Sequence, residues 1–289
     1  MEPLYLVIKD MSVINANLSS SYFTADLSQN AYLGFSHNLL RSLNKNIPCI
    51  KRFGKTIKKS ELGKEQIFSI IKHFEFNLGH SSFAGHLNDA NHQALNIPMN
   101  PPEIKGSIKQ TLVIKLFIQC RDEDLKSWVQ EFLLFNRFSG GDIQNANELS
   151  IEIIKDEANL TKSLQFEKGW VVKDVTHRLV EKAKQSDYST AFCDFLSTFK
   201  ETEKGKTKKE NKVTYKKQHK GWFYASLAGY QLLETPKLRE GARFSYPHAY
   251  AEPIIGLHQL IYFKKQAIQS LFWYGQFEKN TYRLKQGTI

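Results

Sequence analysis

The stretch that decides the fold is Leu4–Asn46, LYLVIKDMSVINANLSSSYFTADLSQNAYLGFSHNLLRSLNKN. Its first residues, Leu4–Ile8, form a short apolar run rich in branched and aromatic side chains, which predicts a buried strand. A polar loop, Asn15–Ser21, is expected to follow. Ser28 can cap a helix that runs to about Asn46, because a stripe of apolar residues recurs there at helical spacing: Tyr32, Leu33, Phe35, Leu39, Leu40 and Leu43.

The next part of the chain repeats this alternation of strands and helices. Gln66–Phe76 and Thr111–Gln119 predict two strands, separated by a long loop, Asn77–Gly106, that we expect to be an extended hairpin. A helix beginning at Asp122 carries Leu125, Trp128, Val129, Phe132 and Leu133 on one face, and Ser139-Gly140-Gly141 ends it before a strand near Ile151. The order βαββαβ is that of an α+β, ferredoxin-like fold, whose helices cover one sheet face and leave the other free for single-stranded RNA.

The remainder of the chain divides into two further parts. We expect a core at residues 1–160, a helical segment with a basic loop at 161–220, and a C-terminal part at 221–289 that packs back on the core. Residues 174–199 have a helical pattern, and residues 200–220 are rich in lysine and predict a mobile basic loop. A last helix is expected at Lys264–Phe277, with Phe272, Trp273 and Tyr274 in the core.

Composition points to a polyanionic partner. The 289 residues carry a formal net charge of +11, and their 40 cations comprise 32 Lys and eight Arg. This balance favours contact with a phosphate backbone over bidentate reading of base edges. One basic cluster lies at residues 51–64 and a second at 200–220.

Several classes of protein lose support. The three cysteines form no CxxC pair, and no histidine spacing matches a zinc signature, so we predict neither a disulfide framework nor a metal site. The motifs GxSxG, GxxxxGK[ST] and GxGxxG are absent, and we predict no cofactor and no catalytic residue. No apolar run reaches the length of a membrane helix and the start does not read as a signal peptide, so a cytoplasmic protein is expected.

Several separated motifs resemble one family. They are Ser12–Asn17 (SVINAN), Tyr32–Leu39 (YLGFSHNL), Arg137–Gly141 (RFSGG), Lys220–Trp222, Ala228–Tyr230, Tyr250–Leu257 (YAEPIIGL), Leu271–Tyr274 and Tyr282-Arg283. The ordered set resembles the subunit of the type I-F CRISPR surveillance complex (Cascade) that belongs to the RAMP superfamily and caps the 5′ handle of the guide RNA. The resemblance covers nearly the whole chain.

The resemblance implies a modified ferredoxin-like fold (RAMP or RRM-like) with a long thumb hairpin in the 77–106 loop. It implies a non-catalytic subunit that binds the CRISPR guide RNA, abuts the helical backbone subunit and in most complexes pairs with a large subunit. In a minimal complex without that large subunit, this protein would itself read the motif beside the target. The thumb loop is poor in Arg and rich in His and Asn, which departs from the family.

The resemblance also implies roles for particular residues. The amides of Asn15 and Asn17 are candidates for hydrogen bonds to unpaired bases and 2′-hydroxyl groups. Arg137 with Gly140 and Gly141 is a candidate for close approach of the main chain to a phosphate. His37 is a further candidate, although a hydrogen-bonded structural role is more common for a lone helical histidine.

The lysine-rich loop lies where the family varies. We hypothesise that Lys206, Lys208, Lys209, Lys216 and Lys217 contact the phosphates of target double-stranded DNA.

Two other functions remain open from the residues alone. The chain could be a metal-independent endoribonuclease that processes the guide precursor, using His37 with a Tyr and a Lys as acid and base. It could also be a free-standing RNA-binding module.

Overall fold

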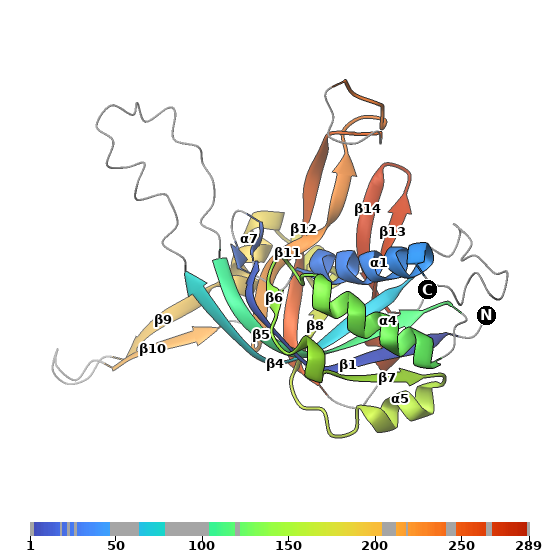
Figure 1. Cartoon of the computed structure of the whole chain (residues 1–289). Helices are drawn as coiled ribbons and strands as arrows, with labels where there is room; N and C mark the ends of the chain where they lie inside the picture. Colours follow the sequence, from blue (N-terminus) through green and yellow to red (C-terminus); the bar gives the residue numbers. More distant parts are fainter. Residues whose placement is uncertain are drawn as a thin grey trace, which may run out of the picture.

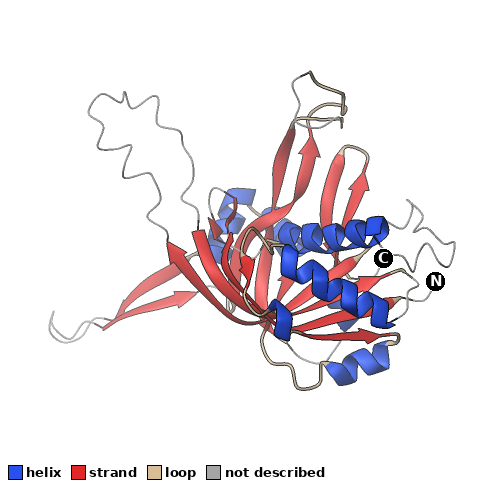
Figure 2. Ribbon diagram, viewed as in Figure 1, coloured by secondary structure: helices blue, strands red, loops and turns tan. Residues whose placement is uncertain are grey.

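The computed structural model describes residues 3–17, 19–21, 24–25, 28–46, 64–78, 104–118, 122–203, 212–217, 219–240, 247–263 and 268–287. Strands dominate these residues, and two long helices lie together across the middle of the molecule (Figure 2). The protein is therefore a mixed α+β structure built on a large antiparallel sheet.

The first half of the chain has the predicted order βαββαβ. It contains β1 (Leu4–Asn17), α1 (Gln29–Asn46), β4 (Gln66–Leu78), β5 (Ile104–Leu116), α4 (Asp122–Phe135) and β7 (Ser150–Ile154). These strands lie in the order β4-β5-β1-β7, and every neighbouring pair is antiparallel. Helices α1 and α4 lie side by side over one face of the sheet, with their apolar stripes buried (Figure 1). The sequence periodicity predicted these elements because one face of each helix had to be covered.

The ends of these strands depart from the predictions. β1 continues to Asn17, so the loop expected at Asn15–Ser21 is wrong for its first three residues. Residues 19–21 and 24–25 form the short strands β2 (Ser19–Ser21) and β3 (Thr24–Ala25). β4 and β5 reach into the predicted 77–106 loop, since Leu78 pairs with Ile104; the rest of that loop, 79–103, lies outside the described residues.

Six further strands, five of them in the second half of the chain, extend the same sheet to ten strands. The added strands are β6 (Asp142–Ile143), β8 (Trp170–Asp174), β11 (Trp222–Leu232), β12 (Ala251–Tyr262), β13 (Trp273–Glu278) and β14 (Thr281–Gln286). β12 pairs with β8, while β13 pairs with β14 along its length and meets β4 at Trp273 and Ile67. The C-terminal residues thus return to the core, and Figure 1 shows β13 and β14 rising beside α1.

The helix predicted at Lys264–Phe277 is wrong. Residues 268–271 form the single-turn helix η5 (Ile268–Leu271), and strand β13 begins at Trp273. Phe272 and Trp273 are fully buried, so the prediction that they belong to the core is confirmed, whereas Tyr274, predicted with them, is only partly buried. A short run of aromatic and apolar residues fits both the helical and the strand period, and pairing with β14 makes this run a strand.

The sheet face opposite α1 and α4 is covered, which corrects the prediction of a free face. Gln110 of β5 faces α1, because its Oε1 accepts a hydrogen bond from the Tyr32 hydroxyl at 2.7 Å. Thr111, next along the strand, therefore faces the other way, yet its side chain is fully buried. Its Oγ1 donates to Glu167, beyond α5 (Glu157–Ser163), and Phe272, beyond η5, packs on Tyr5 of β1. Single-stranded RNA therefore has no open platform at the middle of this sheet.

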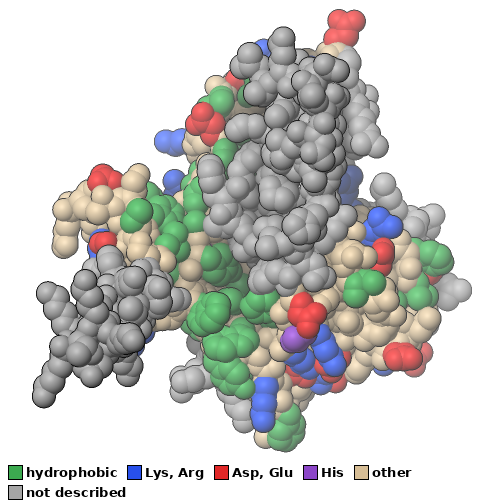
Figure 3. All heavy atoms as spheres, turned by 90° about the vertical axis from the view of Figure 1, so that its left-hand side faces the viewer, with side chains coloured by type: hydrophobic (Ala, Val, Ile, Leu, Met, Phe, Trp, Pro, Cys, Tyr) green, Lys and Arg blue, Asp and Glu red, His purple; other side chains and the backbone are tan. Residues whose placement is uncertain are grey.

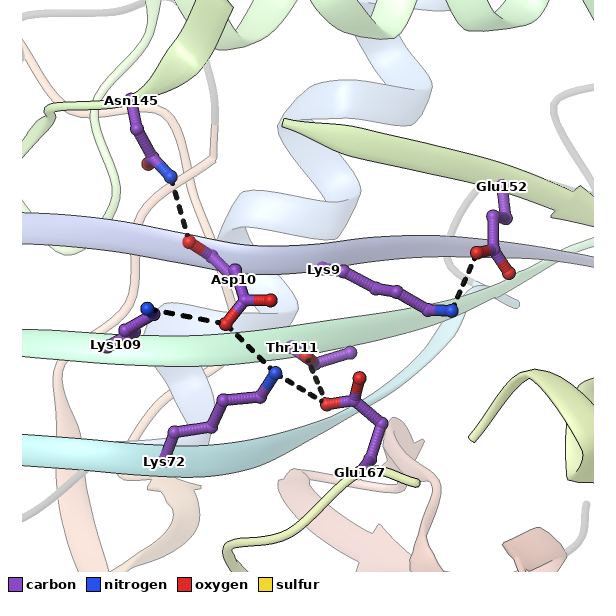
Figure 4. A network of polar contacts seen from close by, with 8 residues as sticks. All are labelled: Lys9, Asp10, Lys72, Lys109, Thr111, Asn145, Glu152 and Glu167. Carbon is purple, nitrogen blue, oxygen red and sulfur yellow. Dashed lines mark hydrogen bonds and ion pairs between the residues drawn. The ribbon is translucent and has the colours of Figure 1, made fainter. Parts of the chain in front are cut away.

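A network of charged groups fastens this covering segment to the sheet (Figure 4). Lys72 Nζ lies 2.9 Å from Asp10 Oδ1 and 2.8 Å from Glu167 Oε2, while Asn145 donates to the Asp10 carbonyl oxygen at 2.9 Å. Burial alone would raise the pKa of the Asp10 carboxyl, but Lys72 and then Lys109 outweigh it and hold that pKa below its usual value. Asp10 has a left-handed backbone, with φ 58°, inside an irregularity of β1. The network therefore stabilises a strained point of the central strand.

The segment predicted as helical at 174–199 contains two short helices. α6 (Thr176–Ala183) follows β8, and α7 (Tyr188–Leu196) starts at Asp187, whose Oδ1 accepts from the Thr190 amide at 2.9 Å. The predicted mobile loop at 200–220 is partly wrong, because β9 (Thr198–Glu203) and β10 (Lys212–Lys217) form an antiparallel ribbon that projects from the sheet (Figure 1). Within the described ranges, no helix is long and apolar enough to cross a membrane.

Candidate nucleic-acid-binding surface

The predicted RNA-binding residues Asn15 and Asn17 lie at the end of β1. A bulge between Val13 and Ala16 gives Asn15 a left-handed backbone with φ 54°, a conformation that asparagine tolerates better than most residues. Both asparagines are exposed. Their backbone is therefore held in a strand rather than in the predicted loop, which fixes the direction from which both side-chain amides project.

A tight turn, Phe138–Gly141, packs against this strand end. Phe138 is buried beside the Tyr32 and Phe35 rings of α1, and it exchanges two backbone hydrogen bonds with Gly141. Ser139 and Gly140 between them have φ of 49° and 78°, the left-handed pair of a type I′ hairpin turn. The turn therefore forms because glycine stands where the backbone must turn left-handed.

Hydrogen bonds and close packing join the turn to β1. The backbone N–H of Asn17 donates to the backbone carbonyl oxygen of Ser139 at 2.8 Å, and the Ser139 hydroxyl donates to the backbone carbonyl oxygen of Asn17 at 2.6 Å. A Cβ on Gly141 would lie 2.4 Å from the Ile14 carbonyl oxygen, so only glycine fits there. The structure thus brings Asn15, Asn17 and the 137–141 motif together, although more than 100 residues separate them in the chain.

Within this turn the two glycines differ. Gly141 is buried, and its amide donates to the Phe138 carbonyl, so its role in the structure is close packing on β1. Gly140 is exposed, and no atom lies within 4 Å of the place where its Cβ would be, apart from its chain neighbours. A phosphate can approach the main chain at Gly140, whereas Gly141 acts by holding the turn in place.

Arg137 supplies the positive charge of this surface. Its side chain is 71% exposed, and its Nε lies 3.1 Å from Asp142 Oδ1. An exposed ion pair of this kind contributes little to stability, so a phosphate can take the place of the carboxylate at small cost. The arrangement offers exposed amides, one guanidinium and an open glycine backbone, which suits an unpaired RNA strand.

The contact that His37 makes is with a residue outside this surface. His37 is on α1, and its Nδ1 lies 2.6 Å from Oε1 of Glu65, whose side chain is only 4% exposed. Glu65 directly precedes β4, so the pair joins the helix to the strand. This contact supports a structural role and brings His37 to none of the other predicted RNA-binding residues.

The predicted DNA-binding lysines are only partly described. Lys206, Lys208 and Lys209 lie outside the described residues. Lys216 and Lys217 are on β10, where they pair with Phe199 and Thr198 of β9. Part of the lysine-rich segment therefore has a regular backbone.

Sequence reasoning missed a cationic cluster beside this ribbon. The Arg178 guanidinium lies over the Phe195 and Phe223 rings at 5.4 and 5.3 Å, and Lys182 lies 5.7 Å from the Phe195 centroid. The His219 ring stacks on Phe195 at 4.2 Å, and burial, followed by the charges of Lys182 and Arg178, lowers the pKa of His219. Residues from α6, α7 and the start of β11 meet here, and no local sequence pattern indicates that they would.

Metal and cofactor sites were not predicted. Among the described residues, no group of three or more His, Cys, Asp or Glu side chains could hold a metal ion.

Comparison with known proteins identifies one match. The model of a family described as CRISPR-associated protein (Cas_Csy2) matches residues 6–284, which is nearly the whole chain. No curated protein matches the sequence significantly.

Proposed function

The chain belongs to the Cas_Csy2 family, and from this premise we propose that the end of β1 and the 137–141 motif form the surface that holds the guide RNA. As a member of this family it is a non-catalytic subunit of the type I-F CRISPR surveillance complex and binds the 5′ handle of the guide. The family assignment overturns the two alternatives, a guide-processing endoribonuclease and a free-standing RNA-binding module. The partners of the family are the guide RNA and the other subunits of the complex.

One observation carries the proposal for this surface. Asn15, Asn17 and Arg137, each exposed, meet at one place only because the 138–141 turn is bonded to β1. Amides that donate and accept hydrogen bonds suit unpaired base edges and 2′-hydroxyl groups, and a guanidinium suits the phosphates between them. Gly140 would add an open backbone beside the guanidinium, and Gly141 would act through the turn. We assign His37 a structural role.

Isosteric substitutions test this surface without changing its shape. The double variant Asn15→Asp, Asn17→Asp keeps the size of both side chains and the tolerance of Asn15 for a positive φ, but it removes amide donors and adds negative charge. We expect it to weaken binding of a synthetic RNA carrying the 5′ handle by about tenfold or more, since each lost hydrogen bond contributes about 1 kcal/mol. Fluorescence anisotropy of the labelled RNA measures the affinity.

Asn280→Asp provides the matched control, because Asn280 is an exposed asparagine between β13 and β14. It adds a negative charge far along the chain from the candidate surface and should leave handle affinity within about twofold. Equal affinities of the double variant and the control would refute the assignment of this surface.

We further propose the RAMP type of fold, with the thumb formed by β4, β5 and the segment between them. Pairing of Leu78 with Ile104 supports this, because two strands still paired at that point form the base of a hairpin. The thumb and the candidate surface would then share β5, whose Lys105 pairs with Asn17 of β1. The neighbouring backbone subunit would bind on this side, and a large subunit, where one exists, would complete the cap.

The lysine-rich segment would contact target DNA. We assign this role to Lys206, Lys208, Lys209, Lys216 and Lys217, and the projecting ribbon of β9 and β10 supports it, since a projecting basic ribbon can reach a duplex outside the RNA-binding surface. Replacing all five by Gln should weaken DNA binding of the assembled complex and reduce the slope of log affinity against log salt by up to about four. An unchanged slope would exclude this segment as a DNA contact.

A further inference from the structure

An apolar pocket lies between β4 and the strands of the second half of the chain. Its volume is about 140 Å³, and it is lined by Phe74, Trp170, Trp222 and Leu260. Trp222 is 64% exposed and Trp170 is 39% exposed, unusually high values for the largest apolar side chain. Neither tryptophan is used by the candidate surface described above.

Strand pairing brings the pocket residues to one end of the sheet. Trp222 pairs with Leu260, and Trp170 pairs with Tyr262, so their side chains share a face of β8, β11 and β12. The Trp170 and Tyr262 rings meet edge to face at 5.7 Å, and Tyr262 is 46% exposed. Two exposed tryptophans therefore line the pocket, and the exposed ring of Tyr262 packs on one of them.

The pocket depends on a close contact between two strands. A Cβ on Gly169 would lie 2.4 Å from the Ile71 carbonyl oxygen, so glycine alone lets the Trp170 strand approach β4. Ile71 pairs with Trp170 at this point, and Phe74 follows three residues later on β4. The ring of Phe74 is thereby placed opposite the tryptophans.

Positive charge accompanies both tryptophans. Each is preceded by the same two residues, giving Lys168-Gly169-Trp170 and Lys220-Gly221-Trp222, and both lysines are exposed. Figure 3 shows the left-hand side of Figure 1 face on, with hydrophobic side chains gathered near its centre and Lys and Arg side chains, mixed with Asp, Glu and His, below them. Aromatic rings with flanking cations are the combination that binds bases and phosphates of a single strand.

We propose that this pocket takes an unpaired nucleobase of the guide RNA, stacked on Trp222 and Trp170, with Lys168 and Lys220 near the adjoining phosphates. A protein partner would also cover apolar rings, but lysine is depleted at protein–protein interfaces, whereas a lysine beside each ring complements the phosphates of a nucleic acid, so charge complementarity favours RNA. The proposal rests on the guide-binding function and adds a second contact, distinct from the β1 surface. It also replaces the sheet face, which the structure shows to be covered, as the place where bases stack.

A double-mutant cycle between protein and RNA tests the proposal. The probes are synthetic handle RNAs in which one nucleotide at a time is abasic, and the proteins are the full chain and its Trp222→Ala variant. We expect Trp222→Ala to weaken binding of the intact RNA by about tenfold with an unchanged salt slope. One abasic position should weaken the unaltered protein by a similar factor and have no further effect on the variant, because both changes remove the same stack.

Two further variants separate stacking from misfolding. Trp222→Phe keeps a ring and should retain affinity within about threefold of the unaltered protein. Phe277→Ala removes another exposed ring, 58% exposed on β13, and should have no effect. If no abasic position couples to Trp222, or if Trp222→Ala loses protein subunits while keeping RNA affinity, the pocket is not a base-binding site.

The same titrations distinguish failure of this proposal from failure of the proposed function. The RNA affinity of the double variant Asn15→Asp, Asn17→Asp tests the β1 surface independently of the result obtained with Trp222→Ala. Coupling at Trp222 with normal binding by the asparagine variant would support the pocket alone, and the reverse result would support the β1 surface alone.

Discussion

His258 gives the protein an acid-sensitive stability that can be calculated. Its side chain on β12 is fully buried, and it packs against the rings of Tyr224 and Trp273, with centroids 5.8 and 4.9 Å away. Among the described residues neither ring nitrogen has a hydrogen-bond partner. Burial lowers the pKa of His258 from 6.5 to about 4, although the charge of nearby Asp174 opposes the shift.

The direction of the effect follows from proton binding. In the unfolded chain His258 takes up a proton below pH 6.5, whereas in the folded protein it does so only below about pH 4. The unfolded state therefore binds more protons between these values, and the free energy of unfolding falls as the pH falls through them. Because one unit of pKa shift corresponds to about 1.4 kcal/mol, this histidine should remove about 2 kcal/mol of stability between about pH 7.5 and pH 5.

Urea unfolding at the two pH values measures this change, with the variant His258→Phe for comparison. Phenylalanine keeps an aromatic ring between Tyr224 and Trp273 but cannot bind a proton, so the variant should lose about 2 kcal/mol less on acidification than the unaltered protein. At neutral pH its stability should change by no more than about 1.5 kcal/mol, as for a volume-conserving core substitution. His177→Gln, at an exposed histidine of α6, is the control and should keep the full acid dependence.

The reasoning would be refuted if His258→Phe retained the pH dependence of the unaltered protein. That result would mean that the histidine is protonated in the folded state or that other groups cause the loss of stability.

Four other substitutions test packing and ion pairing in the fold. Gly141→Ala should destabilise the protein by about 2 kcal/mol or more in thermal unfolding, because the new methyl group would overlap the backbone of β1; Gly34→Ala, on α1 where nothing lies within 4 Å, should instead stabilise it by about 0.5–1 kcal/mol. Lys72→Met removes the cation that two carboxylates share, and it should lower the free energy of unfolding, measured with urea, by about 1–3 kcal/mol. Raising the salt concentration should restore less than half of the stability that the variant loses. Phe272→Ala should cost about 3–5 kcal/mol, since this ring is fully buried on the covered sheet face; a loss below about 1 kcal/mol would mean that the face is open.

Much of the first half of the fold could be predicted from local patterns. The apolar run at Leu4–Ile8 and the helical stripe from Tyr32 to Leu43 each have one period, and each corresponds to the observed element, β1 or α1. β5 and α4 follow the same rule. The helices are predictable because a single buried face sets the spacing of their apolar residues, and the strands because a short continuous apolar run is typical of a strand that is buried on both faces.

The errors fall where pairing with another strand, or contact with another segment, sets the structure. β13 was predicted as part of a helix because Phe272-Trp273-Tyr274 stand at helical spacing beside Ile268 and Leu271, and β14 supplies the hydrogen bonds that make it a strand. β9 and β10 have few large apolar residues, so their ribbon is decided by pairing with each other. The covered sheet face depends on Thr111, whose burial comes from a segment more than fifty residues further along the chain.

The sequence by itself determined the charge, the order βαββαβ and the family motifs, because charge, periodicity and motif order are properties of neighbouring residues. Only the tertiary structure decided that Asn15 and Arg137 share a surface, since the bonds between Asn17 and Ser139 that join them cross more than 100 residues. The pocket of Trp170 and Trp222 was decided in the same way, by the pairing of β8 and β11 with β12. Long-range hydrogen bonds and close packing at glycine leave no local pattern, so they appear only when the chain is folded.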